Sequence, residues 1–338
     1  MRSMRRATAA VLATALLLLP TSAHAAVTNA ERAAWAAGFI SSRQQTNGAI
    51  PSFSTVGSTA DAVVALVAAR RGPVNINKAM RFLARRVKAG DYGVPSVEEV
   101  GVKAKIVLAA VASGRNPRKF AEHNLVREIT QTEQSDGRYG AGTAVFNHAT
   151  AMLALVAAGA SASDGAVDWL AGAQCDDGGW AYDDAQQAGD DEHCTDTGDP
   201  GNDYFPSDTN TTSLAVQALS RTGALAAPAH DPFAFFAAAR DGENGWGYQL
   251  GGETDANSTG MVIQAHKAAG VALPTGAMRA MKALQYKFCG AFRYNWSWGN
   301  TPDVGATIAG VLGVLRRPLP VKPVRVRLAP PAPIGCPA

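Results

Sequence analysis

One stretch decides how the rest of the chain is interpreted: Trp169-Leu170-Ala171-Gly172-Ala173-Gln174-Cys175-Asp176-Asp177-Gly178-Gly179-Trp180. Apolar residues with helical spacing come first, and a glycine-rich turn that ends in tryptophan follows. Glycine lets the backbone enter the left-handed conformations that tight turns use. A glutamine near a helix end can hydrogen-bond the backbone groups that the last turn leaves unpaired. The stretch therefore predicts a helix, residues 167–173, that ends in a tight turn.

The turn recurs along the chain, in most copies as glycine, any residue and then an aromatic residue. The third positions of the turns are Ile50, Tyr92, Tyr139, Trp180, Trp246 and Phe292, which lie 42, 47, 41, 66 and 46 residues apart. The fourth step is the longest, and residues 181–208 hold its extra length. Self-similarity at such a period indicates a repeat architecture.

A helix-like apolar segment precedes each turn, and another follows each of them. Examples of the preceding segments are 35–42, 78–87, 167–173 and 233–239, and examples of the following ones are 59–69, 103–112, 150–158, 212–219, 259–269 and 307–315. Apolar residues three and four positions apart indicate helices, and the glycines that end several second segments are typical helix stops. Each repeat is therefore predicted to be a helical hairpin. Because one hairpin cannot bury its own apolar face, the copies must pack on one another, either as an open solenoid or as a closed ring.

The spacing in residues 169–180 resembles the QW motif of squalene–hopene cyclases, a motif of the terpene cyclase and protein prenyltransferase family. That motif consists of an aromatic and an aliphatic residue, three spacers, glutamine, a short spacer and Gly-x-Trp. Further copies, less complete, include Phe39, Gln44 and Gly48, and then Phe236, Arg240 in place of glutamine, Gly245 and Trp246. The resemblance covers residues 35–315. It implies an all-α fold, an (α/α)6 toroid of six helix–turn–helix repeats of the prenyltransferase and squalene oxidase type.

The N-terminus has the layout of a secretory signal peptide. Arg2, Arg5 and Arg6 form a positive region, an apolar stretch follows at 11–19, and Ala23-His24-Ala25 is a small-x-small cleavage signal. The apolar stretch is far shorter than the roughly 20 residues of a membrane-spanning helix. We therefore expect a secreted protein with no transmembrane segment in its mature form. The expected parts are the signal peptide 1–25, a toroid domain 26–315 with an acidic inserted loop at 181–208, and a proline-rich tail 316–338.

Without the signal peptide the chain is close to neutral. The whole sequence has 31 Lys and Arg against 28 Asp and Glu, and the signal peptide holds three of the arginines. Binding to nucleic acid requires a clear positive excess. The composition therefore argues against a nucleic-acid partner.

Four cysteines, Cys175, Cys194, Cys289 and Cys336, lie outside the signal peptide. An even number in an exported protein predicts two disulfides, with three possible pairings. We favour Cys175–Cys194, which closes a local loop, and Cys289–Cys336, which ties the tail to the body. Zinc is the weaker alternative, because the chain has no C-x-x-C pair and only His193 adjoins a cysteine.

The resemblance identifies a fold and not a reaction. The Asp-x-Asp-Asp acid of cationic cyclases does not occur in the sequence. Asp190-Asp191-Glu192-His193-Cys194 departs at its last position from the Asp-Asp-x-x-Asp motif of diphosphate-ionising relatives. Cys289-Gly290-Ala291 is not the thioester motif of complement-type toroids. No catalytic residue is therefore assigned.

Aromatic residues gather in the last three turns. They include the pairs Trp180/Tyr182, Trp246/Tyr248 and Phe292/Tyr294. The turns of a closed ring lie at one end, where such rings could stack on a sugar or an apolar ligand. The aromatic candidates for ligand binding are Trp180, Tyr182, Trp246, Tyr248, Tyr294, Trp296 and Trp298. The alternative is packing between repeats, which suits Trp180 and Trp246 best.

Polar residues at the starts of the second helices have two interpretations. Asp208, Asp255 and Asp303 each precede a threonine by four residues. In the first interpretation they form a ring of carboxylates around the mouth of the toroid and are candidates for ligand binding. In the second they are N-caps of the helices. His148 also precedes a second helix. It is either a general base or a structural histidine.

Residues 196–203 could offer oxygens to Ca²⁺, although they lack a recognised calcium-loop spacing. The alternative is a solvated loop. No other metal or cofactor is expected.

These features favour an exported, non-catalytic protein that binds an apolar or aromatic-stacking ligand at the turn end. A small molecule or a glycan fits that description. The main alternative is a divergent secreted enzyme, related to terpene cyclases or active on polysaccharides, and a cell-envelope interaction module is a third. Paired carboxylates that face one pocket would favour the enzyme.

Overall fold

The computed structural model describes residues 27–183, 194, 205–287, 289–295, 297 and 301–336. The expected signal peptide, the candidate Ca²⁺ loop at 196–203, Trp296 and Trp298 lie outside the described residues. Within that part the chain forms twelve α-helices, two short 3₁₀ helices (Ser96–Glu98 and Pro117–Lys119) and one two-stranded antiparallel sheet, β1 (Trp180–Ala181) and β2 (Ser207–Asp208). The chain is therefore mostly helical, as the repeats predict.

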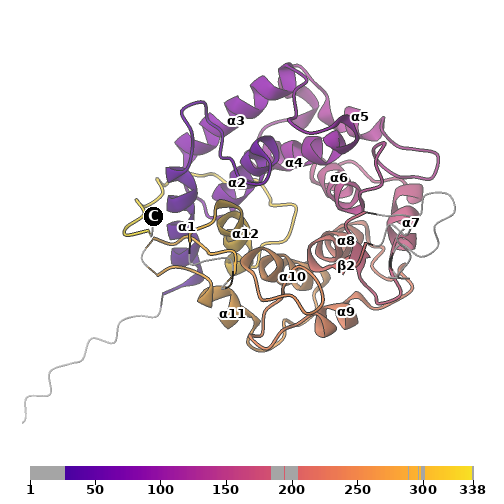
Figure 1. The fold of residues 1–338 in the computed structure, drawn as a ribbon. Helices are drawn as coiled ribbons and strands as arrows, with labels where there is room; N and C mark the ends of the chain where they lie inside the picture. Colours follow the sequence, from indigo (N-terminus) through magenta and orange to yellow (C-terminus); the bar gives the residue numbers. More distant parts are fainter. Residues whose placement is uncertain are drawn as a thin grey trace, which may run out of the picture.

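The helices alternate between an inner and an outer ring (Figure 1). The inner helices are α2 (Thr55–Ala68), α4 (Glu99–Ala112), α6 (Val145–Ala157), α8 (Thr209–Thr222), α10 (Ala256–Ala269) and α12 (Val304–Leu315). The outer ones are α1 (Asn29–Ser42), α3 (Pro73–Lys88), α5 (Leu125–Thr130), α7 (Asp164–Gly172), α9 (Pro232–Ala238) and α11 (Ala277–Ala283). Each inner helix packs against the next, and α12 packs against α2. The inner ring is therefore closed, which an open solenoid would not be.

Sequence pattern explains which helices lie inside. Every residue of α12 from Ala306 to Val314 is buried, because neighbours surround an inner helix on all sides. The outer helix α3 instead buries one face, which includes Ile76, Met80, Leu83 and Val87. Such a stripe, with polar residues on the other side, is typical of a helix that packs against a core.

The same hydrogen bond fastens four of the turns to the inner helix that follows. The N–H of the third turn residue donates to a threonine hydroxyl, in the pairs Ile50–Thr59 (2.8 Å), Trp180–Thr212 (2.9 Å), Trp246–Thr259 (3.0 Å) and Phe292–Thr307 (2.9 Å). We call these residues the clamp threonines. The turn also needs its glycine: Gly178 has a φ of 86°, and a Cβ there would lie 2.8 Å from the carbonyl oxygen of Asp231.

The glutamine of the motif joins neighbouring hairpins. Gln174 donates to the carbonyl of Gly178 in its own turn (2.9 Å) and to that of His230 ahead of α9 (3.0 Å). At the end of the ring, Gln285 donates to the carbonyl of Arg32 in α1 (2.9 Å). This last bond joins the final hairpin to the first, so the motif residue helps to close the ring.

The disulfides are Cys175–Cys194 and Cys289–Cys336, which is the pairing that the sequence favoured. All four cysteines are used in these bonds, so none of them is free to bind zinc. Two disulfides are compatible with an extracellular location. Among the described residues, no helix has the length and apolar character to cross a bilayer.

The described part of the C-terminal tail, residues 316–336, forms no helix and contacts the C-terminal parts of α8 and α2. The N–H of Leu319 donates to Oε1 of Gln217 in α8 (2.8 Å). Further along, the carbonyl of Leu328 accepts from the N–H of Gly72, after α2 (3.0 Å). In Figure 1 the tail, in yellow, passes across part of the central opening. The tail therefore covers one end of the ring.

Candidate functional site

A cavity of about 180 Å³ lies at the centre of the inner ring. All the inner helices line it, and much of its wall is apolar: Val64, Leu108, Leu214, Met261, Ile308 and Leu312. On α10 the lining residues Asn257, Met261 and Gln264 are three or four positions apart, so they share one helix face. The closure of the ring therefore creates the cavity from one stripe of each inner helix.

Two charged side chains meet in this wall. Asp61 of α2 and Lys105 of α4 form an ion pair with an Oδ2–Nζ distance of 2.8 Å, and their side chains are 37% and 25% exposed. The Lys105 ammonium also lies 5.6 Å from the ring centre of Phe146. Asp61 is the only carboxylate among the described residues of the lining. The pair is therefore a local polar point in a mostly apolar wall.

The two ends of the cavity differ. Leu319 of the tail lines the cavity at the C-terminal ends of the inner helices. At the turn end, Phe53 precedes α2 and is 77% exposed, and Phe146 lies in the first turn of α6. The ring of Phe146 stacks against that of Tyr182 at 5.7 Å. The cavity thus has an aromatic rim at the turn end and a cover of tail residues at the other.

This chemistry suits the binding of an apolar molecule with one polar group. The wall offers apolar contact, and the Asp61–Lys105 pair offers one acceptor and one donor. Glycoside hydrolysis generally uses two carboxylates about 5 to 10 Å apart. The described lining of the central cavity holds one carboxylate, and an ammonium group neutralises it.

A larger and more polar pocket, of about 590 Å³, opens on the turn face. Its lining includes Glu98, Asp136, Arg138, Tyr182 and Asp183. Arg138 and Asp136 form an ion pair (3.7 Å), and Oδ1 of Asp183 is buried with no hydrogen-bond partner among the described residues. Tyr182 lies between this pocket and the rim of the central cavity, because its ring also stacks on Phe146.

The three predicted aspartates are helix caps. Asp208, Asp255 and Asp303 precede α8, α10 and α12, and each accepts a first-turn N–H at 2.6–2.9 Å. None of them lines the central cavity. Burial is the main cause that raises the pKa of Asp208 and that of Asp255 to about 6. The structure thus gives these carboxyl groups the capping role that the sequence left open.

The predicted aromatic residues divide into buried and exposed ones. Trp180 and Trp246 are fully buried, and their indole N–H groups donate to the carbonyls of Leu170 and Phe236 (2.7 Å each). The structure therefore places these two rings in the packing of the hairpins, which is the alternative that the sequence suggested for them.

The three tyrosines share a backbone contact. The carbonyls of Tyr182, Tyr248 and Tyr294 accept N–H groups at the start of the preceding inner helix, from Phe146 (3.4 Å), Thr209 (2.8 Å) and Ala256 (2.9 Å). The aromatic-x-Tyr pattern thus links successive hairpins. The side chains of Tyr182 and Tyr248 are 39% and 38% exposed, so their rings stay candidates for contact with a ligand.

His148 accepts the hydrogen bond from its turn that a clamp threonine accepts in four other hairpins. Its position in the sequence had suggested the place of a capping aspartate. It is fully buried, its Nδ1 accepts the N–H of Tyr139 (3.0 Å), and its Nε2 lies 2.9 Å from the carbonyl of Ala166. Burial is the main cause that lowers the pKa of His148 to about 4. With both ring nitrogens engaged, this histidine is structural and not a general base.

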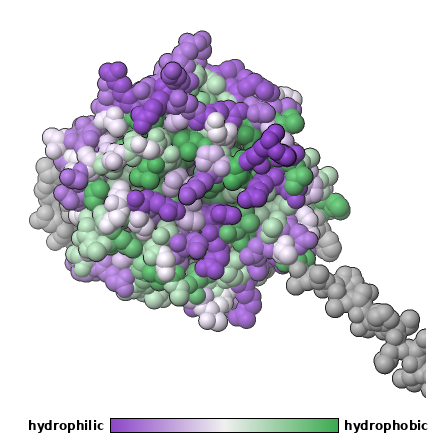
Figure 2. Space-filling model, turned by 180° about the vertical axis from the view of Figure 1, so that it is seen from behind, coloured by the Kyte–Doolittle hydropathy of each residue, from purple (hydrophilic) through white to green (hydrophobic). Residues whose placement is uncertain are grey.

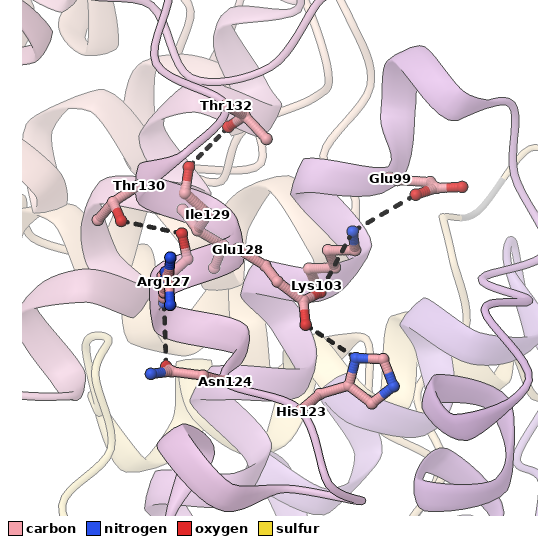
Figure 3. Close-up of polar contacts among 9 residues, drawn as sticks. All are labelled: Glu99, Lys103, His123, Asn124, Arg127, Glu128, Ile129, Thr130 and Thr132. Atoms are coloured by element: carbon pink, nitrogen blue, oxygen red, sulfur yellow. Dashed lines mark hydrogen bonds and ion pairs between the residues drawn. The ribbon is translucent and has the colours of Figure 1, made fainter.

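Figure 3 shows an ionic cluster between the inner helix α4 and the outer helix α5. Lys103 contacts Glu99 (3.5 Å) and Glu128 (3.4 Å), and Glu128 also contacts Nδ1 of His123 (2.8 Å). The Lys103 ammonium lies 4.9 Å from the ring centre of Tyr92. Because these charges satisfy one another on the outer side of α4, the cluster ties α5 to the ring and is not a candidate site.

Sequence reasoning missed the central pair and the aromatic rim. Asp61 is the only charged residue in α2, whose sequence is otherwise TVGSTA and AVVALVA on either side. A lone charge in an otherwise uncharged inner helix is unfavourable unless it faces a polar partner or a cavity. That signal pointed to Asp61, although it could not identify Lys105 as the partner.

No protein-family model and no curated protein matches the sequence. Several solved structures are similar in fold. An α-1,6-mannanase of Salegentibacter is 13% identical, with a TM-score of 0.56, over 86% of this chain and 98% of that chain. A type II terpene cyclase of Scytonema is 14% identical, with a TM-score of 0.54, over 86% and 98%. An unsaturated glucuronyl hydrolase specific for heparin is 10% identical, with a TM-score of 0.58, over 85% and 95%.

At these identities the likeness concerns the fold alone. The terpene cyclase belongs to the kind of protein that the sequence motif resembles. The mannanase and the glucuronyl hydrolase do not. The chain therefore shares the α/α-toroid fold with a terpene cyclase, a mannanase and a glucuronyl hydrolase.

Proposed function

We propose that this protein binds a compact, largely apolar molecule with one polar group in its central cavity, entered from the turn end. The observation that carries the proposal is the cavity of about 180 Å³ with an apolar wall from all the inner helices. An apolar cavity of about 150 Å³ stays dry and binds benzene. A ligand slightly larger than benzene therefore suits this cavity, and its polar group meets the Asp61–Lys105 pair.

The proposed role is binding without reaction, by an exported relative of the QW-repeat proteins built from six hairpins. The single ion-paired carboxylate of the cavity and the two disulfides support this view. A structure of the terpene cyclase holds geranylgeranyl dihydroxybenzoate. A toroid of this kind is thus compatible with a ligand that is mostly hydrocarbon.

Calorimetric titration with p-cresol and with toluene tests the proposal. The two probes have similar shapes, and only p-cresol carries a hydroxyl that can donate a hydrogen bond to Asp61. We expect p-cresol to bind with a dissociation constant of about 10 µM to 1 mM. Toluene should bind about 10- to 150-fold more weakly, because a hydrogen bond to a charged group contributes about 1.5 to 3 kcal/mol.

A matched pair of variants locates the binding. Ala309→Leu adds bulk inside the cavity, since Ala309 lines it on α12. Ala30→Leu makes the same change at an exposed position of α1. We expect Ala309→Leu to abolish p-cresol binding and Ala30→Leu to leave it unchanged. Equal binding by both variants would place the probe elsewhere and overturn the proposal.

A second candidate function is glycan binding in the turn-face pocket. The exposed ring of Tyr182 beside Glu98 and Asp183 favours it, because sugars stack on aromatic rings and donate hydroxyls to carboxylates. The mannanase of similar fold has been solved with α-1,6-mannotriose, which is the probe of choice. Binding that Tyr182→Ala removes and Ala309→Leu spares would support this candidate. Binding that Tyr182→Ala leaves intact would exclude it.

A further inference from the structure

A third cavity, of about 230 Å³, lies under the C-terminal tail and collects four positive charges. Arg70 follows α2, Arg221 belongs to α8, and Arg317 and Lys322 belong to the tail. Among the described residues no Asp or Glu lines it, and the remaining residues of its wall are valine, alanine and proline. Since the ends of α2 and α8 form it, this cavity lies on the side of the ring opposite the turns.

The four cations have no carboxylate partner among the described residues. The Nε of Arg221 donates to the carbonyl of Leu319 (3.0 Å), which holds the guanidinium against the tail. Overall composition does not explain the cluster, because acidic and basic residues are equal in number after position 25. The cavity is therefore a local excess of positive charge beside a partly apolar wall.

Helix dipoles account for only part of this excess. The C-terminal ends of α2, α8 and α12 lie beside the cavity, and each carries about half a negative charge. Together they balance less than half of four positive charges.

The backbone of Arg70 adds an independent observation. Its φ is 55°, in the left-handed region that favours glycine, and the inner helices α4, α6, α8 and α10 are followed there by Gly114, Gly159, Gly223 and Gly270. Arginine in this conformation costs free energy that glycine avoids. The inner helix α12 also ends at an arginine in this conformation, Arg316 (φ 51°), and of these two arginines only Arg70 lines the cavity.

The cavity is held in shape before any ligand arrives. The tail is fixed on one side by the bond from Leu319 to Gln217 and on the other by the bond from Gly72 to Leu328. The disulfide Cys289–Cys336 anchors the chain beyond them. A preorganised site loses less conformational entropy on binding, so these fixed cations suit a specific ligand better than a flexible basic tail would.

We propose that this cavity binds a dianionic tetrahedral oxyanion, phosphate or sulfate, either free or as a monoester on a larger molecule. Guanidinium groups match the geometry of such oxygens and donate two parallel hydrogen bonds. The site is distinct from the proposed central one, because Leu319 and its neighbours in the tail separate the two cavities.

Calorimetric titration of the full chain with inorganic phosphate at constant ionic strength tests this site. We expect binding at micromolar to low millimolar concentration by the wild type. The double variant Arg317→Gln, Lys322→Gln should bind about tenfold more weakly or worse, since charge-assisted hydrogen bonds are lost. Arg325→Gln removes a tail charge outside the cavity and should keep the wild-type affinity. Melting temperatures of all three proteins confirm that they are folded.

Two outcomes would overturn the proposal. One is an absence of phosphate binding by the wild type up to about 10 mM. The other is an equal loss of affinity in the double variant and in Arg325→Gln, which would indicate non-specific charge attraction. A parallel titration with glycerol phosphate separates the sources of the anion. Tighter binding of the ester assigns a monoester ligand, and tighter binding of phosphate assigns the free anion.

Discussion

Asp208 combines a structural role with an unusual titration. Its Oδ1 accepts two backbone N–H groups at the start of α8, and the side chain of Tyr248 also interacts with the carboxyl group. Burial is the main cause that raises the pKa of Asp208 to about 6. Between about pH 4 and 6 the folded state therefore binds more protons at this group than the unfolded state. Its contribution to stability grows as the pH falls through that window and is lost as the pH rises through 6.

Asp208→Asn should remove this pH dependence. Relative to the variant, the wild type should gain about 2 kcal/mol of unfolding free energy between pH 7.5 and 4.5. Urea unfolding of both proteins at the two pH values measures the difference. His148, whose pKa is lowered to about 4, acts with the opposite sign but is present in both proteins, so its contribution cancels. A difference that does not change with pH would show that Asp208 titrates normally.

Among the elements, the turn-to-helix clamp carries the most direct stability prediction. Thr212→Val keeps the shape of the side chain and removes the acceptor of the Trp180 N–H, which is fully buried. An unpaired buried donor costs about 1 to 3 kcal/mol. Chemical denaturation should show a loss of that size, whereas Thr130→Val at an exposed position should stay within about 0.5 kcal/mol of the wild type. Equal effects of the two changes would mean that the clamp does not stabilise the hairpin.

Most of the elements could be predicted from the sequence, but their limits could not. The inner helix expected from residue 212 begins at Thr209, and the one expected from 259 begins at Ala256. Both begin earlier because the capping aspartates precede the clamp threonines. The outer helix before the third turn, α5 (Leu125–Thr130), could not be given limits from the sequence, because six residues show too little periodicity. Arg240 departs from the QW motif, yet its guanidinium reaches the carbonyl of Thr275 ahead of the next outer helix, the role that glutamine has elsewhere.

The candidate site was harder to predict than the fold. Aromatic residues in the turns pointed to the turn end, but Trp180 and Trp246 are buried because the hairpins pack around their rings. The pair of Asp61 and Lys105 forms only when α2 and α4 lie side by side in the ring. Contacts of this kind depend on how the ring closes, which no local pattern encodes. That the hairpins are six copies of one unit stays a prediction.

At the scale of the whole molecule, closure gives the ring two unlike ends. The turn end carries the aromatic rim of Phe53 and Phe146, and the other end carries the tail with its basic cavity. Figure 2 shows one face of the molecule, on which hydrophilic and hydrophobic residues are interspersed. The apolar wall of the central cavity comes from all the inner helices, so no single hairpin could form it.

The measurement that tests this view most directly is an NMR titration of protein with ¹³C-labelled methionine methyl groups. Met261 lines the central cavity, whereas Met80 of α3 and Met278 of α11 belong to outer helices. We predict that p-cresol shifts the methyl resonance of Met261 in a saturable manner and leaves those of Met80 and Met278 in place. An unmoved Met261 resonance, or equal shifts of all three, would contradict a ligand site at the centre of the ring.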